Sequence, residues 1–173
     1  SGTAGPPRAR SQTTRVSVSS SGVQANGACL APSIDARGRF VTFESSASTL
    51  VAGDLGSQRD VYVHDRQTGT TRRVSIGQGR PEADGNSGDP EISGNGRFVV
   101  FTSDAANLVD GDTNGVSDVF VAHLETGVVE RVSLSSSGLQ GARSNLEGSI
   151  SDDGRYVAFT TFSSGLAAGD TTT

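Results

Sequence analysis

The feature that most constrains this chain is an internal repeat with a period of 58 residues. The tripeptide Arg-Val-Ser begins at residues 15, 73 and 131, and Gly-Arg-aromatic-Val begins at residues 38, 96 and 154. Gly-Asp recurs at residues 53, 111 and 169, and Asp-Val recurs at 60 and 118. Because several unrelated motifs keep one spacing, the chain consists of about three copies of one structural unit.

Each unit reads as four short strands separated by turns. In the middle unit the strands are expected at residues 90–93, 97–102, 118–123 and 128–134, where apolar and β-branched residues are bounded by Gly, Asn, Asp and Ser. The second strand is apolar on both faces, whereas a strand with one face in water alternates apolar and polar residues. We therefore expect this strand to be covered on both sides.

This pattern predicts an all-β chain made of β-propeller blades, each a four-stranded antiparallel sheet. Neighbouring blades of a propeller cover each other's faces, which explains a doubly apolar inner strand. Low apolar content, 33% of residues, suits many short strands joined by many turns. A two-sheet sandwich is the alternative, but it does not explain why whole four-strand units repeat at a fixed length.

The register of the repeat predicts the domain boundaries. Residues 1–13 are expected to be a flexible N-terminal segment, and residues 14–173 to be propeller repeats. The boundaries within the repeats are 14–30 for a displaced outer strand and its loop, 31–88 and 89–146 for complete blades, and 147–173 for a partial blade. Propellers commonly close with about 4 to 8 blades. We therefore expect an incomplete arc of about three repeats, either as a fragment of a longer propeller or paired with another copy.

The middle unit carries a motif that is specific to one type of repeat. It reads Ile-Ser-x-x-Gly-Arg-Phe-Val-x-Phe from residue 92, Asn-Leu-Val-x-Gly-Asp-Thr-Asn-Gly-x-x-Asp-Val-Phe-Val from residue 107 and Thr-Gly-x-x-x-Arg-Val-Ser from residue 126. This motif resembles the WD40-like PD40 repeats of TolB-type bacterial β-propellers, and the resemblance covers residues 14–173. It implies a secreted or periplasmic bacterial protein that acts as a binding scaffold, although such a fold does not define one function.

Composition argues against several classes of function. The chain of 173 residues has a formal net charge of −5, and all 14 of its basic residues are Arg. An acidic chain with scattered Arg is not typical of nucleic-acid binding, and no apolar run approaches the ~20 residues that span a bilayer. A single Cys excludes an intrachain disulfide and a four-Cys zinc site. We expect no nucleic-acid partner and no membrane span.

The sharpest candidate site is the loop at residues 110–118. Oxygen ligands at alternate positions, followed by Gly115, match the first half of an EF-hand loop, and Val121 stands where an EF-hand has Glu. The candidate Ca²⁺ ligands are Asp110, Asp112, Asn114, the carbonyl of Val116 and Asp118. The alternative is a turn in which Asp and Asn side chains cap backbone N–H groups.

No catalytic residue is assigned from the sequence. His64 and His123 are expected to be surface or edge-strand residues, and no Gly-x-Ser-x-Gly elbow is present. Two sets of Arg recur with the repeat. One set is interpreted as charge on exposed outer edges, namely Arg15, Arg73 and Arg131. The other is expected to pair with carboxylates and hold blade to blade, namely Arg39, Arg97 and Arg155.

These features predict a non-enzymatic, secreted or periplasmic scaffold for macromolecular recognition or assembly. Its partner is expected to be another protein or a further copy of the chain, bound through variable loops on one rim. The loops expected there are residues 19–30, 77–88 and 135–147. Three alternatives stay open: a calcium-supported, lectin-like propeller that binds a glycan, an accessory propeller of a larger hydrolase, and a self-assembling structural unit.

Overall fold

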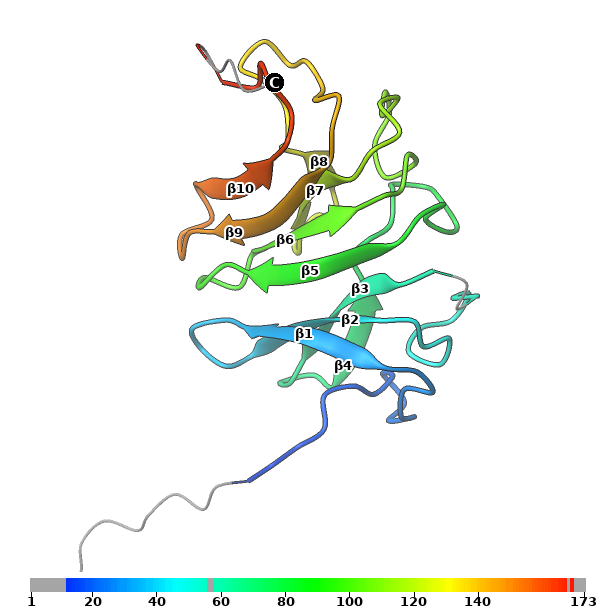
Figure 1. Ribbon diagram of the computed structural model, residues 1–173. Coiled ribbons are helices and arrows are strands. Elements are labelled where there is room, and N and C mark those ends of the chain that lie inside the picture. The colour runs from blue at the N-terminus through cyan, green and yellow to red at the C-terminus, as the bar shows by residue number, and fades with distance from the viewer. Residues whose placement is uncertain (1–11, 56–57, 168, 170–173) are drawn as a thin grey trace, which may run out of the picture.

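A computed structural model shows the described part of the chain, residues 12–55, 58–167 and 169, as a set of three β-sheets (Figure 1). No helix occurs among these residues. The strands are β1 (Cys29–Ile34), β2 (Phe40–Ser45), β3 (Asp60–Asp65), β4 (Thr70–Arg73), β5 (Ser87–Ile92), β6 (Phe98–Ser103), β7 (Asp118–His123), β8 (Val129–Arg131), β9 (Asn145–Ile150) and β10 (Val157–Thr161).

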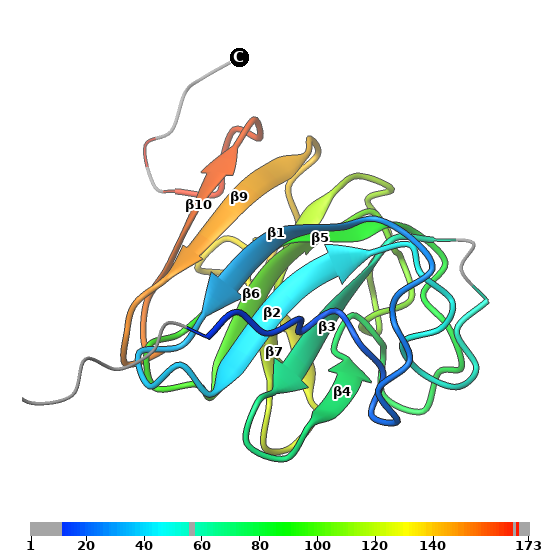
Figure 2. The same cartoon turned by 90° about the horizontal axis from the view of Figure 1, so that it is seen from below.

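The strands pair with their sequence neighbours to form blades. Blade 1 is the sheet β1-β2-β3-β4, blade 2 is β5-β6-β7-β8, and blade 3 is the two-stranded sheet of β9 and β10. Every one of these pairings is antiparallel. The first strands lie side by side, because β5 contacts both β1 and β9 (Figure 2). The predicted fold class, an all-β, incomplete arc of propeller blades, is confirmed.

The hydrophobic core lies between the blades rather than inside one sheet. Val61 and Val63 of β3 pack in one cluster with Val99 and Phe101 of β6. On the opposite face of blade 2, Val100 packs with residues of blade 3 in a second cluster. Both faces of β6 are therefore buried, which confirms the inference drawn from its doubly apolar sequence.

A repeated bulge shapes the first strand of every blade. Ala31, Asp89 and Glu147 take left-handed φ angles of 48°, 50° and 48°, and they occupy equivalent positions in the repeat. The register of the sheet shifts at each of these places. A bulge of this kind redirects side chains at the edge of a sheet. The three residue types differ, so the bulge could not be recognised from the sequence.

Backbone N–H groups of these first strands join one blade to the next. The N–H of Ile92 donates to Ser33 Oγ at 3.2 Å, and the N–H of Ile150 donates to Glu91 Oε1 at 3.4 Å. These two bonds are equivalent in the repeat, since both donors and both acceptors are 58 residues apart. Adjacent blades are thus joined in the same way at both contacts between them.

The segment before β1 differs from the prediction. Residues 14–18 were expected to form an outer strand, yet Val18 makes only an isolated bridge with Gln24. In blades 1 and 2 the fourth strand pairs with a third strand, β3 or β7. Among the residues that the structure describes, no strand pairs with residues 14–18 in a sheet. The predicted flexible segment, residues 1–13, lies outside the described residues except for its last two.

Candidate functional site

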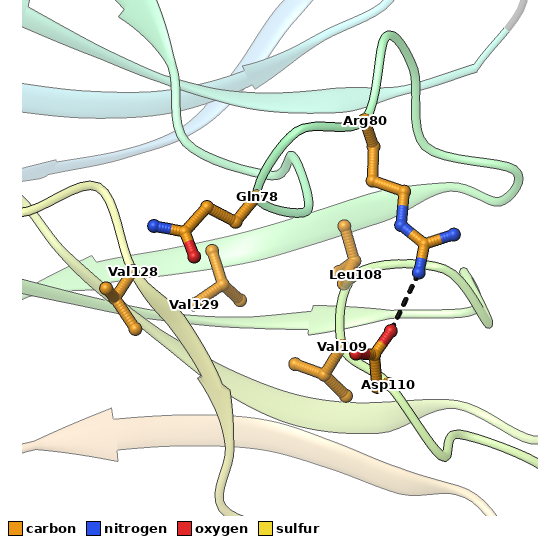
Figure 3. Close-up of a pocket in the computed structure, with 7 residues that line it drawn as sticks. All are labelled: Gln78, Arg80, Leu108, Val109, Asp110, Val128 and Val129. Carbon is orange, nitrogen blue, oxygen red and sulfur yellow. Dashed lines mark hydrogen bonds and ion pairs between the residues drawn. The ribbon is translucent and has the colours of Figure 1, made fainter.

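The predicted calcium ligands take part in different contacts in the structure. Asp110 is exposed and pairs with Arg80, whose Nη2 lies 2.9 Å from Asp110 Oδ1 (Figure 3). Val116 is half-buried, and its N–H donates to Asn114 Oδ1 at 3.4 Å. Asp118 begins β7, as the alternative interpretation of this loop expects. Asp110 therefore has an ion pair of its own, with Arg80.

The other three side chains meet around a guanidinium group. Arg131 Nη1 lies 2.8 Å from Asp112 Oδ1 and 3.4 Å from Asp118 Oδ2. Asn114 donates its Nδ2 to Asp118 Oδ2 at 2.8 Å, so its amide nitrogen faces that carboxylate. Burial raises the pKa of Asp112, and Arg131 acts against this rise. The cluster already has a cation in Arg131, and calcium binding stays a prediction.

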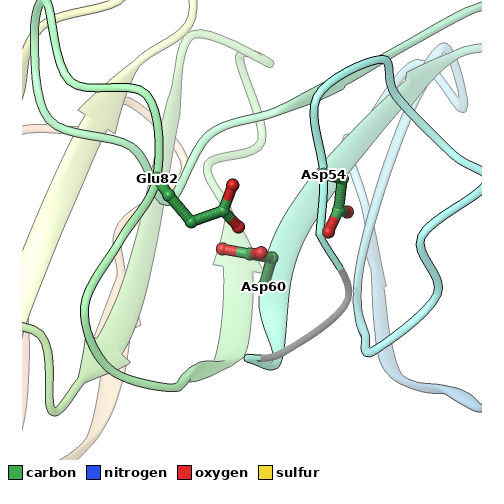
Figure 4. A group of neighbouring side chains, drawn as sticks. All are labelled: Asp54, Asp60 and Glu82. Carbon is green, nitrogen blue, oxygen red and sulfur yellow. The ribbon is translucent and has the colours of Figure 1, made fainter.

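Blade 1 holds an equivalent cluster that is richer in acid. Oxygen atoms of Asp54, Asp60 and Glu82 lie within 4.8 Å of one another (Figure 4). Arg73 Nη1 lies 3.0 Å from Asp60 Oδ2 and 2.6 Å from Glu82 Oε1. Tyr62 donates its hydroxyl to Asp54, and its pKa is raised by burial and then by this hydrogen bond. The sequence analysis did not identify this cluster.

The two clusters are built on one repeated frame. Ser75 donates to Asp60 Oδ1 at 2.7 Å, and Ser133 donates to Asp118 Oδ1 at 2.5 Å. Each Ser also accepts the N–H of the residue that follows the Asp. The common spacing of Arg-Val-Ser and Asp-Val was the signal that could have predicted this contact. These hydrogen bonds join the start of the third strand to the segment that follows the fourth strand, so we assign the frame a structural role.

The two interpretations of the repeated Arg residues are each wrong in part. Arg73 and Arg131 do not place charge on an exposed edge, because their side chains are 6% and 7% exposed. The other set does pair with carboxylates, as expected, but within its own blade instead of between blades: Arg39 with Asp65, Arg97 with Glu125 and Arg155 with Asp153. Each of these partners is close in the fold because it lies in the same sheet or in an adjoining turn.

The prediction for the two His residues is wrong for His64. This residue is buried on β3, between β2 and β4, and its Nδ1 lies 2.8 Å from Thr71 Oγ1. Burial lowers its pKa. His123 is half-buried and packs edge-on against Phe98, with ring centroids 4.9 Å apart. Among the described residues, the side chain of His64 contacts Thr71 and that of His123 contacts Glu130, and neither pair is the Ser-His-Asp arrangement of nucleophilic catalysis.

The loops predicted to bind a partner do line cavities. The blade 2 pocket has a volume of about 220 Å³ and lies between the 77–88 loop, the loop after β6, and the start of β8 (Figure 3). Its lining residues are Gln78, Arg80, Leu108, Val109, Asp110, Val128 and Val129. The ion pair between Arg80 and Asp110 forms part of this lining.

The same pocket occurs in blade 1, displaced by one repeat. The blade 1 pocket has a volume of about 500 Å³ and includes residues of the predicted 19–30 loop. Its lining residues are Ser19, Ser20, Ser21, Val23, Ser48, Thr49, Leu50, Val51, Ala52 and Thr71. Gly22 and Ala52 stand where blade 2 has Arg80 and Asp110, so no ion pair can form there. The pocket recurs, but its size and its chemistry change.

Comparison with known proteins finds similar solved structures, but it does not assign the chain to a family. No family model and no curated protein matches the chain. Similar solved structures include TolB from Acinetobacter baumannii, with 24% identity over 82% of this chain and 28% of that one, at a TM-score of 0.49. The tricorn protease shares 15% identity over 76% of this chain and 11% of that one, at a TM-score of 0.47. A TolB-like protein from Agrobacterium tumefaciens shares 19% identity over 78% of this chain and 44% of that one, at a TM-score of 0.44.

The chain therefore spans less than half the length of each of these structures. Two of them are TolB-type proteins. The class of protein is defined by the blades themselves, as an incomplete β-propeller. Within the described ranges, the structure has no helix that is long and apolar enough to cross a membrane.

Proposed function

We propose that this chain is the recognition part of a non-enzymatic, secreted or periplasmic β-propeller, and that it binds another protein through its loop pockets. One observation carries the proposal: both complete blades form the same pocket at equivalent positions of the repeat, with different lining residues. A constant scaffold with variable loops is the usual way in which a rigid fold acquires binding specificity.

The blade 1 pocket suits recognition better than the blade 2 pocket. Val23 is 51% exposed at its edge, and Leu50 is buried at its base. Ser19 fixes the loop, because its Oγ accepts the N–H of Val23 at 3.1 Å and lies 2.9 Å from Ser21 Oγ. A loop that is already held in place loses less conformational entropy on binding. The blade 1 pocket presents apolar groups next to hydroxyl groups, and such a lining suits the binding of a protein partner.

A glycan is the less favoured partner, since no aromatic residue lines either pocket. Carbohydrate sites commonly use the face of an aromatic ring as a platform. The lectin-like alternative is therefore an outcome of the test rather than a second proposal.

Selection of peptides from a random library on the immobilised 173-residue chain tests the proposal. Ala52→Arg places a long cation in the blade 1 pocket, and it should weaken the selected peptides about tenfold or more, as measured by fluorescence anisotropy. The matched control is Ala106→Arg, at an exposed position that lines neither pocket, and it should leave binding unchanged.

The proposal fails if no peptide is selected, or if the selected peptides bind both variants equally. Binding on a glycan array that Ala52→Arg abolishes would replace it with the lectin-like function.

A further inference from the structure

The ion pair of the blade 2 pocket has no counterpart in the other repeats. Arg80 Nη2 lies 2.9 Å from Asp110 Oδ1, between the loop that leaves blade 1 and the loop after β6. The equivalent positions of the repeat hold small uncharged residues, namely Gly22, Ala52, Gly138 and Ala168. The pair is therefore an addition to one repeat and is not part of the common blade.

The walls of this pocket also depart from the repeat. Val128 and Val129 stand where blade 1 has two Thr residues, so aliphatic side chains replace two hydroxyl groups. In Figure 3, Val128 lies at one end of the pocket and the ion pair at the other, with Leu108 and Val109 near the pair. The blade 2 pocket is therefore aliphatic along its length and charged at one end.

The shape of the pocket is held from both sides. Val109 and Val129 pack against the core cluster between blades 1 and 2. A Cβ at Gly77 would lie 2.5 Å from the carbonyl oxygen of Asn107, so the 77–88 loop lies directly against the loop after β6. A pocket that is already formed loses less conformational entropy when a ligand enters it.

The carboxylate of Asp110 is a weakly held partner of Arg80. The side chain of Asp110 is 98% exposed, and that of Arg80 is 42% exposed. An ion pair in contact with water contributes little, because water solvates both charges when the pair is broken. The contact joins one nitrogen to one oxygen, whereas a guanidinium can hold a carboxylate through two parallel hydrogen bonds. A carboxylate supplied by a ligand can therefore displace Asp110 from Arg80.

The volume and the charge of the pocket together specify the ligand. A cavity of about 150 Å³ holds a group of the size of benzene. The volume of about 220 Å³ therefore accommodates one aliphatic side chain with a carboxylate beside it. A protein presents these two groups together at a C-terminal Val, Leu or Ile, where the α-carboxylate and the side chain are attached to the same carbon atom.

We propose that the blade 2 pocket binds the C-terminal residue of a partner protein when that residue is aliphatic. The side chain of this residue packs against Val109 and Val129, and its α-carboxylate replaces Asp110 as the partner of Arg80. The inference rests on the proposed function, since it takes a loop pocket as a protein-binding site, and it adds the chemistry of the bound segment. The charge that makes this pocket less suited than the blade 1 pocket to a neutral surface makes it suited to a chain terminus.

The probe is the acetylated peptide Gly-Ser-Gly-Ser-Leu with a free C-terminal carboxylate, titrated into the ¹⁵N-labelled 173-residue chain. We expect saturable NMR shifts of the amides of residues 77–80 and 108–110. The same peptide with a C-terminal amide should bind about tenfold more weakly, because it lacks the charge that Arg80 recognises. A free-acid peptide that ends in Gly should also bind about tenfold more weakly, because it buries no aliphatic side chain.

Two variants of the protein should change the affinity in opposite directions. Arg80→Gln should remove the difference between the free-acid and amidated peptides, and this coupling identifies a direct contact. Asp110→Asn removes the competing carboxylate and should strengthen binding of the free-acid peptide about threefold. The matched control is Arg97→Gln, since Arg97 is an exposed residue of blade 2 that pairs with Glu125 and does not line the pocket. This control should bind the peptide as wild type does.

The inference is overturned if the free-acid and amidated peptides bind equally, or if Asp110→Asn weakens binding. It also fails if the shifts lie at the blade 1 pocket and Ala52→Arg abolishes them, although the proposed function then stands. Failure of the leucine peptide, together with library peptides that Ala52→Arg weakens, has the same meaning. The absence of any selected library peptide counts against the proposed function instead.

Discussion

In blade 1, Arg73 lies among three carboxylates, whereas Arg131 of blade 2 lies between two carboxylates and the amide of Gln140. Gln140 stands 58 residues after Glu82, so one substitution in the repeat accounts for the extra acid of blade 1. The Arg, the Asp that begins the third strand and the Ser are common to both blades. The comparison shows that the frame requires this trio, while the charge around it can vary.

The largest effect is expected from removing the guanidinium group in blade 1. Arg73→Met leaves three clustered carboxylates without their cation, so the free energy of unfolding should fall by about 3–5 kcal/mol. Arg131→Met should lower the free energy of unfolding by less, because it leaves only two carboxylates beside the neutral amide of Gln140. Urea denaturation of both variants at pH 7 measures the difference.

The control for this prediction is Glu82→Gln, made in the Arg73→Met background. It converts the blade 1 cluster to the composition of blade 2 and should recover part of the lost stability. Equal losses in the two Arg variants, with no recovery, would show that the extra carboxylate has no energetic consequence.

A smaller effect is expected at the turn glycines, which distinguish the contacts between blades. Gly38, Gly96 and Gly154 all have left-handed φ angles, so Ala at each position costs about 1 kcal/mol in backbone strain. A Cβ at Gly154 would overlap the ring of Phe98, and one at Gly96 would lie 3.0 Å from the ring of Phe40. At Gly38 the nearest atom is 3.6 Å away.

The loss of stability should therefore follow the order Gly154→Ala, Gly96→Ala, Gly38→Ala, with the first adding about 1–3 kcal/mol of overpacking. Thermal unfolding measures this order. A loss for Gly38→Ala as large as for Gly154→Ala would mean that strain in the turn, and not contact with the preceding blade, sets the cost.

The smallest effect concerns the pH dependence of blade 1. Burial raises the pKa of Asp60 above its ordinary value of 3.8, although Ser75 and Arg73 act against this. The folded chain then binds more protons than the unfolded chain, so stability falls as pH rises above 3.8 toward the folded-state pKa. Denaturation at several pH values should show this fall in the wild type and a weaker one in Asp60→Asn.

Asp65 is a control with the opposite expected pH dependence, since the hydrogen bond from Arg39 lowers the pKa of its carboxyl group. Its contribution is present above the ordinary pKa and is lost as pH falls below it. If Asp60→Asn leaves the pH profile unchanged, this carboxylate does not account for the fall.

Several features of the fold could be predicted from the sequence, because each depends on local pattern. The strand of residues 118–123 was predicted with the bounds of β7, since the Asp before a continuous apolar run marks its start. The burial of both faces of β6 followed from its doubly apolar run. The 58-residue period predicted the number of units and their common construction.

The candidate site was only partly predictable. The variable loops were identified because their position in the repeat is constant, and residues of the first two line the blade 1 and blade 2 pockets. The Asp110–Asp118 loop was predicted to bind Ca²⁺ because its pattern resembles the first half of an EF-hand loop. The sequence distance between Asp118 and Arg131 concealed that β7 and the end of β8 bring the two side chains together.

The sequence by itself thus determined the repeat, the blade and the apolar faces, because these depend on periodicity along the chain. Only the tertiary structure decided that Arg73 and Arg131 are buried, and that Gly22 and Ala52 leave the blade 1 pocket without an ion pair. Those properties depend on which side chains meet when sheets pack face to face and loops return over them. The periodicity of the sequence does not predict such side-chain contacts, since the partners lie on different strands and in different blades.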